Sequence, residues 1–158
     1  MKTLFTLILI LTISSNFSYC QEFKVPSNYK LDKDEDYPQY EKDVIAAINY
    51  FENTPLNKIS NRQEINAFLV GWITGTPSVT IELLLDMIPF RDNKDLLAAY
   101  MNGWTKFSIE NPSLKSDNVK CNVAALESVI KVYKLNDMKK VKSVEEFIKL
   151  QKKDELEK

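Results

Sequence analysis

Apolar residues recur three and four positions apart along most of the chain, which is the spacing of one face of an α-helix. The first such stripe predicts a helix over residues 37–53, with Asp36 as its N-cap, Pro38 in its first turn and Thr54-Pro55 as its end. Its apolar positions are Tyr40, Val44, Ile48 and Phe51.

The second predicted helix follows Ser60 and ends near Gly75. Ser60 and Gln63 have the spacing of a capping box, in which two side chains bond the free N–H groups of the first turn. Gly75 stands where a left-handed C′ residue is expected after the last turn. The apolar face comprises Ile65, Phe68, Leu69, Trp72 and Ile73.

Three more helices are predicted in the second half of the chain. One begins near Asp92 and ends before Pro112, and the next begins after Ser116 or Asp117. The last opens at Ser143 and Glu146, a second capping box. Their apolar faces are Leu96, Leu97, Tyr100, Met101, Trp104 and Phe107; Val119, Val123, Leu126, Ile130 and Tyr133; and Val144, Phe147, Ile148 and Leu150.

Residues 77–88 fit two patterns. Apolar residues alternate from Val79 to Leu85, as in a strand, whereas Thr76 as N-cap, Pro77 at the first position and Pro89 as the stop suit a helix. A lone strand would have no partner in this chain, so a helix is favoured. The chain is therefore predicted to be all-α, with one domain of about six helices over residues 37–158, arranged as a bundle or as helical-hairpin repeats.

The first 20 residues resemble an export signal. Met1-Lys2 precedes an apolar run from Leu4 to Leu11 and a polar exit, which is the organisation of a secretory signal peptide. Cleavage is expected after Cys20, and a lipoprotein anchored through Cys20 is the disfavoured alternative because bulky Tyr19 precedes it. Residues 21–36 read as a polar, solvated N-terminal arm, and no later stretch is long enough to span a membrane.

Composition narrows the chemistry available to this chain. It has 21 basic and 22 acidic residues, a balance that argues against nucleic-acid binding through bulk positive charge. It has no histidine, so the commonest general base and metal ligand are absent, and its 3 glycines form no phosphate loop. We expect no catalytic residues, no metal site and no cofactor, with Cys121 as a small buried apolar side chain.

A short segment occurs twice. Residues 67–72 (AFLVGW) match residues 99–104 (AYMNGW) at a constant offset, either through a duplicated helical hairpin or by coincidence of helical spacing. A glycine inside a helix costs about 1 kcal/mol against alanine, so each copy needs a compensating role. The structural role is close helix packing over the glycine. The functional alternative makes Trp104, Trp72, Gly103 and Gly71 the candidate ligand- or partner-binding residues.

Residues 66–79 (NAFLVGWITGTPSV) and 103–106 (GWTK) also carry a resemblance. Together they resemble a group of short, exported, uncharacterised proteins of Bacteroidetes-type bacteria, and the likeness covers about residues 36–150. The resemblance implies an all-helical fold and a periplasmic or secreted setting, and it carries over no catalytic residue.

Two charged features have ordinary explanations. Glu82 and Asp86 are four residues apart and could divide acid and base work on one helix face, but the wet face of an amphipathic helix is the better explanation. Lysines around the last two helices form a basic patch that could meet an acidic partner or membrane surface, although a solvated surface is the simpler account. These lysines are Lys134, Lys139, Lys140, Lys142, Lys149, Lys152 and Lys153.

The function predicted from these features is binding without catalysis. The protein would be exported, would act as a monomer or a weakly associating chain, and would bind a protein, a peptide or a small apolar ligand. The alternatives are a periplasmic chaperone or inhibitor and an enzyme using carboxylate chemistry.

Overall fold

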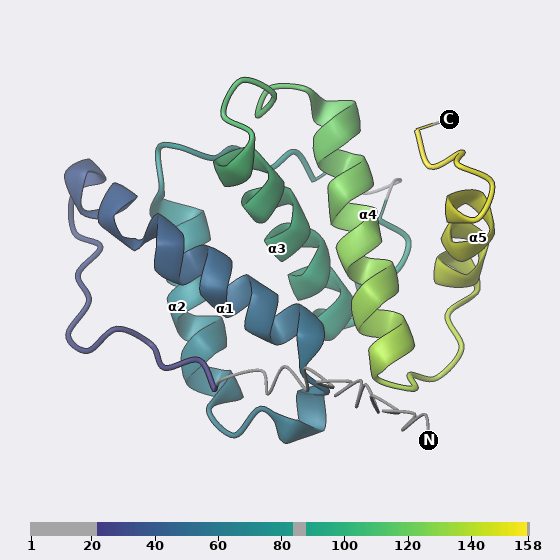
Figure 1. Ribbon diagram of the computed structural model, residues 1–158, viewed down its shortest axis with the longest axis horizontal. Helices are drawn as coiled ribbons and strands as arrows, with labels where there is room; N and C mark the ends of the chain where they lie inside the picture. Colours follow the sequence, from purple (N-terminus) through teal and green to yellow (C-terminus); the bar gives the residue numbers. More distant parts are fainter. Residues whose placement is uncertain (1–21, 84–87, 158) are drawn as a thin grey trace, which may run out of the picture.

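A computed structural model of the chain describes residues 22–83 and 88–157. This part contains five α-helices and three short 3₁₀ helices and no strand, which confirms the predicted all-α class (Figure 1). The α-helices are α1 (Glu41–Asn53), α2 (Arg62–Gly75), α3 (Lys94–Glu110), α4 (Asn118–Leu135) and α5 (Lys142–Gln151). The 3₁₀ helices are η1 (Asp34–Asp36), η2 (Pro38–Tyr40) and η3 (Leu56–Lys58).

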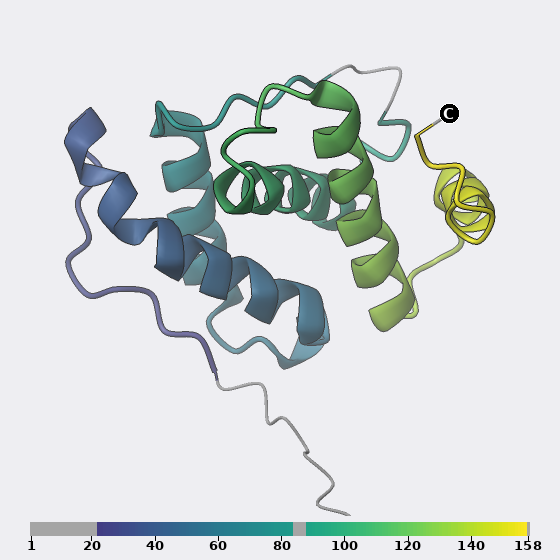
Figure 2. The same ribbon diagram turned by 45° about the horizontal axis from the view of Figure 1, so that its top comes forward.

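The centre of the molecule is the pair α3 and α4, which pack against each other along their lengths. Helix α1 crosses both of them and also packs against α2, while α5 packs on the outer side of α4. Figure 2 shows the resulting order, with α1 and α2 on one side of α3 and with α4 and α5 on the other. The predicted apolar stripes meet in one core, in which Phe51, Phe68, Trp72, Tyr100 and Trp104 are the bulkiest fully buried side chains.

Two helices begin where the sequence indicates. The side chain of Asn93 accepts bonds from the N–H groups of Asp95 and Leu96 at the start of α3. Asp117 accepts from the N–H of Lys120 at 3.1 Å and caps α4, so one of the two residues predicted for this role is confirmed. Such caps satisfy N–H groups that have no partner within the helix.

The predicted capping boxes do not form. Helix α2 begins at Arg62, and the Ser60 hydroxyl instead donates to the carboxylate of Glu22. Helix α5 begins at Lys142, so Ser143 already lies within its first turn and Val141 is the N-cap residue. The box at Ser60 is lost because the N-terminal segment passes close by and offers the hydroxyl a different partner.

Asp36 is not the N-cap of α1. Residues 34–40 form η1 and η2, and α1 starts one residue after Tyr40. The carboxylate of Asp36 accepts bonds from the N–H groups of Asp32 and Lys33, each at 3.0 Å. It therefore closes the turn before η1 rather than the start of α1, since these nearby donors compete for the same oxygen.

The helix predicted over residues 77–88 is absent from the described residues of that range, which form neither helix nor strand; residues 84–87 lie outside the described part. Val79, Ile88 and Phe90 are nevertheless buried. The carbonyl oxygens of Ser78 and Thr80 accept bonds from Lys115 Nζ and Trp104 Nε1. These tertiary partners satisfy carbonyls that a helix would otherwise have satisfied internally.

The N-terminal segment is not a solvated arm throughout. Its apolar side chains pack against the core as partly buried residues, and the ring of Tyr29 meets Phe68 edge-on with centroids 5.0 Å apart. The packed residues are Phe23, Val25, Tyr29 and Leu31. The acidic residues Asp34 and Glu35 are exposed, as predicted for this stretch. No helix in the described part of the chain is long and apolar enough to cross a membrane.

Candidate functional site

Both tryptophans singled out in the sequence lie in the core. Trp72 is fully buried and Trp104 is 2% exposed. The indole N–H of Trp72 donates to the carbonyl of Tyr37 at 3.0 Å, and that of Trp104 donates to the carbonyl of Thr80 at 3.1 Å. Each ring therefore packs inside the protein and holds a neighbouring loop by its polar atom.

The glycines that precede them have different surroundings. A Cβ built on Gly103 would lie 2.6 Å from the Cβ of Ser128 and 2.9 Å from the Cα of Ala125, so α3 and α4 approach closely there, as predicted. A Cβ on Gly71 would meet Leu31 Cδ1 at 3.7 Å, an ordinary contact. Close helix packing over Gly71 is thus wrong, and the two matching segments do not mark equivalent positions of a repeated hairpin.

Gly75 differs from its predicted role as well. It is the last residue of α2, and no described glycine has a positive φ, so it is not a left-handed C′ residue. A Cβ at Gly75 would stand 1.9 Å from the hydroxyl oxygen of Tyr37. The position needs glycine because the buried Tyr37 ring fills the space beside it.

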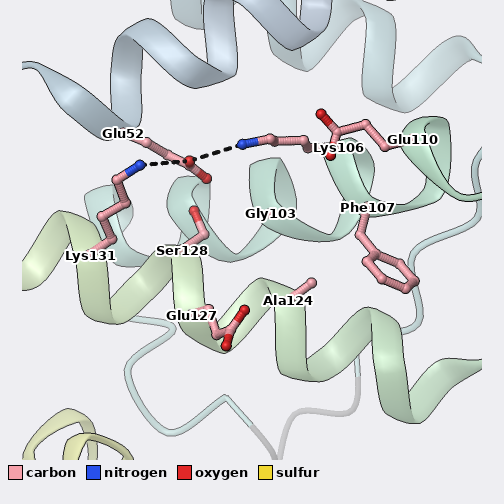
Figure 3. A pocket seen from close by; sticks show the side chains of 9 residues that line it. All are labelled: Glu52, Gly103, Lys106, Phe107, Glu110, Ala124, Glu127, Ser128 and Lys131. Carbon is pink, nitrogen blue, oxygen red and sulfur yellow. Dashed lines mark hydrogen bonds and ion pairs between the residues drawn. The ribbon is translucent and has the colours of Figure 1, made fainter. Parts of the chain in front are cut away.

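A pocket of about 290 Å³ lies between α3 and α4, where α1 closes one end (Figure 3). We call it the α3–α4 pocket. It includes Gly103 but neither tryptophan. Its other lining residues are Glu52 from α1; Lys106, Phe107 and Glu110 from α3; and Ala124, Glu127, Ser128 and Lys131 from α4.

Three charged groups meet at the α1 end of this pocket. Glu52 Oε2 lies 3.5 Å from Lys106 Nζ and 3.5 Å from Lys131 Nζ, so one carboxylate links three helices. Glu52 is 5% exposed, whereas the side chains of the lysines are 25% and 45% exposed. A carboxylate buried this deeply is costly unless it is paired, and here two ammonium groups compensate it.

Each lysine also has a glutamate one turn away on its own helix. Glu110 follows Lys106 by four residues, and Glu127 precedes Lys131 by four, which is the spacing of a surface ion pair. Among the described residues neither of these glutamates pairs with a lysine. Figure 3 shows both lysine heads directed toward Glu52 instead. The lysines pair with Glu52 because this carboxylate is buried, and the attraction between opposite charges is stronger where water is excluded.

The pocket also contains a hydroxyl with no partner. Ser128 is 4% exposed, and its Oγ has no hydrogen-bond partner among the described residues. Its side chain points toward the carboxylate of Glu52, which lies between the two lysine heads (Figure 3). Buried hydroxyl groups are normally bonded, because leaving one unpaired costs about 1–3 kcal/mol. This hydroxyl therefore has a donor and an acceptor that no described residue uses.

A second pocket, of about 450 Å³, lies beside η3 and the connection that follows α4. Arg62 and Asp95 form an ion pair there. The Asn136 side chain accepts from the N–H of Leu56 at 2.6 Å and donates to the carbonyl of Val132 at 2.7 Å. The bonds of Asn136 tie the loop to α4, and the ion pair joins α2 to α3. Arg62 Nε has no hydrogen-bond partner among the described residues.

The other residues considered from the sequence lie elsewhere. Cys121 is fully buried, and burial raises the pKa of its thiol, as fits a packed apolar side chain. Glu82 accepts from Asn118 Nδ2 at 2.7 Å, while Asp86 lies outside the described residues. The seven lysines of the basic patch are all exposed. Within residues 22–83 and 88–157 no cluster of His, Cys, Asp or Glu has the composition of a metal site.

Sequence reasoning missed the charged groups of the α3–α4 pocket. A sign of them was nevertheless present in the first helix, because Val44, Ile48 and Glu52 follow one another at steps of four. Glu52 therefore occupies the buried face of α1, where an ionised residue needs a partner. The identity of those partners depends on how α3 and α4 cross α1, and no spacing in the sequence reveals that.

We compared the chain with protein-family models, with curated proteins and with solved structures, and none of the three comparisons finds a match.

Proposed function

We propose that this protein is a non-catalytic binding protein that holds a small polar ligand in the α3–α4 pocket. The observation that carries the proposal is the hydroxyl of Ser128, which is buried, has no partner among the described residues and points toward the end of the pocket where Lys106 and Lys131 meet Glu52. Polar groups that converge in a concave site and have bonding capacity left over are the usual means by which a pocket orients a ligand.

The charge of the lining supports a small polar ligand over the small apolar ligand, which is one of the three binding partners expected from the sequence. Five of the nine lining residues are charged, and the two with apolar side chains are Phe107 and Ala124. Exposed large apolar side chains among the described residues are scattered over different elements and do not suggest a groove for an apolar partner. They are Val70 on α2, Leu83 before α3, and Val119 and Leu135 at opposite ends of α4.

Chemical-shift mapping tests the proposal. The amide signals of purified, isotope-labelled protein would be followed while a defined set of small polar metabolites is added one by one. We expect at least one compound to give saturable shifts confined to residues 103–110 and 124–131. The proposal is wrong if no member of the set shifts these two segments.

Matched lysine variants locate the effect. Lys131→Met removes a charged group from the pocket, whereas Lys134→Met removes an exposed lysine one turn further along α4 that lies outside the pocket. We expect the first variant to weaken binding of the active compound and the second to leave it unchanged. Equal effects of both variants would point to general surface charge instead of this site.

We further propose that the protein works outside the cytoplasmic membrane. The support is the apolar run from Leu4 to Leu11 after Lys2, together with the resemblance to exported proteins; these first residues lie outside the described part of the chain. Mass spectrometry of the envelope fraction should find a chain that begins at Gln21. A peptide that begins at Cys20 and carries an acyl mass would instead establish a lipid anchor.

A further inference from the structure

We infer that the α3–α4 pocket is built for a small zwitterion of the α-amino acid type, whose carboxylate would bind the lysine N–H donors that Glu52 leaves free, on the side of Lys106 and Lys131 that faces the pocket. This inference rests on the proposed function, and it names the ligand class for the same pocket. It follows from the number of charges at each place in the pocket and from the hydrogen-bonding capacity left over there.

The α1 end of the pocket carries one uncompensated positive charge. Lys106 and Lys131 contribute two, and Glu52 offsets one of them. Each ammonium has three N–H donors; Lys106 donates one of them to Glu52, and Lys131 forms an ion pair with the same carboxylate, so donors remain on both lysines. The hydroxyl of Ser128 adds another donor at the same place. A single carboxylate would neutralise the remaining positive charge, and its oxygens would accept hydrogen bonds from the unused donors.

The remaining lining carries the opposite charge. Glu110 and Glu127 are exposed, and neither is paired with a lysine within the described part of the chain. With them the pocket has three carboxylates against two ammonium groups. A phosphate dianion would fit the lysines but would face this excess negative charge. A ligand that carries one ammonium beside its carboxylate satisfies both parts of the pocket.

The size of the pocket limits the ligand further. Its volume of about 290 Å³ is at the lower end of the range of ~300–1,000 Å³ found for pockets that hold drug-sized molecules. Phe107 and Ala124 form the apolar part of the wall, where a short aliphatic side chain could rest. These features favour a free amino acid over a peptide or a nucleotide.

A matched series of probes separates the two charges of the ligand. The twenty common L-amino acids are titrated into the purified protein, and binding is followed by the amide shifts of residues 103–110 and 124–131. The best amino acid is then compared with its N-acetyl derivative, which lacks the ammonium, and with its amide, which lacks the carboxylate. Inorganic phosphate serves as the anion control.

We expect at least one amino acid to bind saturably and both derivatives to bind roughly tenfold more weakly or worse, as the loss of one charge-assisted contact implies. An N-acetyl derivative or an amide that binds as tightly as the parent overturns the inference, as does phosphate binding tighter than every amino acid. If no amino acid binds while another polar metabolite does, the inference fails and the proposed function stands. If nothing shifts these segments, both fail.

Ser128→Ala tests whether the hydroxyl contacts the ligand, because a hydroxyl with a purely structural role would not change the affinity for an amino acid. The substitution keeps the Cβ that packs near Gly103 and removes a hydroxyl that has no partner within residues 22–83 and 88–157, so folding should not suffer. We expect the affinity for the best amino acid to fall several-fold while the melting temperature stays the same or rises. Unchanged affinity in this variant would show that the hydroxyl does not contact the ligand and would overturn its assigned place in the site.

Discussion

Gly103 of α3 lies so close to Ser128 of α4 that a Cβ on the glycine would stand 2.6 Å from the Cβ of the serine. The same approach brings Lys106 and Lys131, each one turn further along its helix, to the same carboxylate of Glu52. The helix crossing that gives the core its close packing therefore also assembles the charged end of the α3–α4 pocket.

The two glycines of the matching segments should respond oppositely to alanine. Gly103→Ala places a methyl group against the α4 backbone and should destabilise the protein by about 1–3 kcal/mol. Gly71→Ala has room beside Leu31 and should stabilise it by up to about 1 kcal/mol through better helix propensity. Urea unfolding of both variants measures the difference, and a stabilising Gly103→Ala would contradict the close crossing.

The two tryptophans should each contribute strongly to stability. Trp72→Ala and Trp104→Ala leave large cavities and should each cost about 3–5 kcal/mol, out of a total of about 5–15 kcal/mol for a domain of this size. Thermal unfolding checks this, with Val70→Ala as the control because Val70 is 51% exposed. A Trp104→Ala protein with native stability would argue against a core role for that ring.

Cys121 should react slowly with thiol reagents while the protein is folded. Its thiol is fully buried beside the carbonyls of Leu114 and Lys115, and burial raises its pKa, so little thiolate forms near pH 8. A chromogenic disulfide reagent should label it rapidly in denaturant and far more slowly in native buffer. Equal rates in the two conditions would show that the site opens readily.

Asp117 should make α4 sensitive to acid. Bonds from the N–H and side chain of Lys120 hold the pKa of this carboxyl below its ordinary value of 3.8. Because the folded value is lower, the unfolded chain takes up the proton first as the pH falls. The contribution to stability is therefore complete above the ordinary pKa and is lost as the pH falls through the folded value.

Asp117→Asn is the matched variant, since asparagine also caps helices but does not titrate. The stability difference between wild type and variant, measured by urea unfolding at about pH 5 and about pH 2, should shrink at the lower pH. A difference that is the same at both values would mean that the charge of Asp117 does not stabilise α4.

The α-helices of the described chain could be predicted because their apolar spacing depends on local geometry alone. Stripes such as Val44–Ile48 and Phe68–Trp72 bury one face of a helix whatever it packs against. The cap at Asp117 was predictable for the same reason, since donor and acceptor lie three residues apart.

The errors occurred where distant residues compete with local ones. Ser60 has the spacing of a cap but bonds Glu22, and the carbonyl of Thr80 bonds Trp104 in place of a helical partner. Both outcomes depend on segments 24 or more residues away, which local propensity does not take into account.

By itself the sequence determined the helical class, the buried faces and the burial of Trp72, Trp104 and Cys121, because local periodicity and side-chain hydrophobicity act without reference to the rest of the fold. Only the tertiary structure decided that Gly103 is a contact point and Gly71 is not, and that Glu52 meets Lys106 and Lys131. The pocket depends on how α1, α3 and α4 cross. The crossing angles depend on how the surfaces of three separate helices fit together, and the sequence of one helix does not determine that fit.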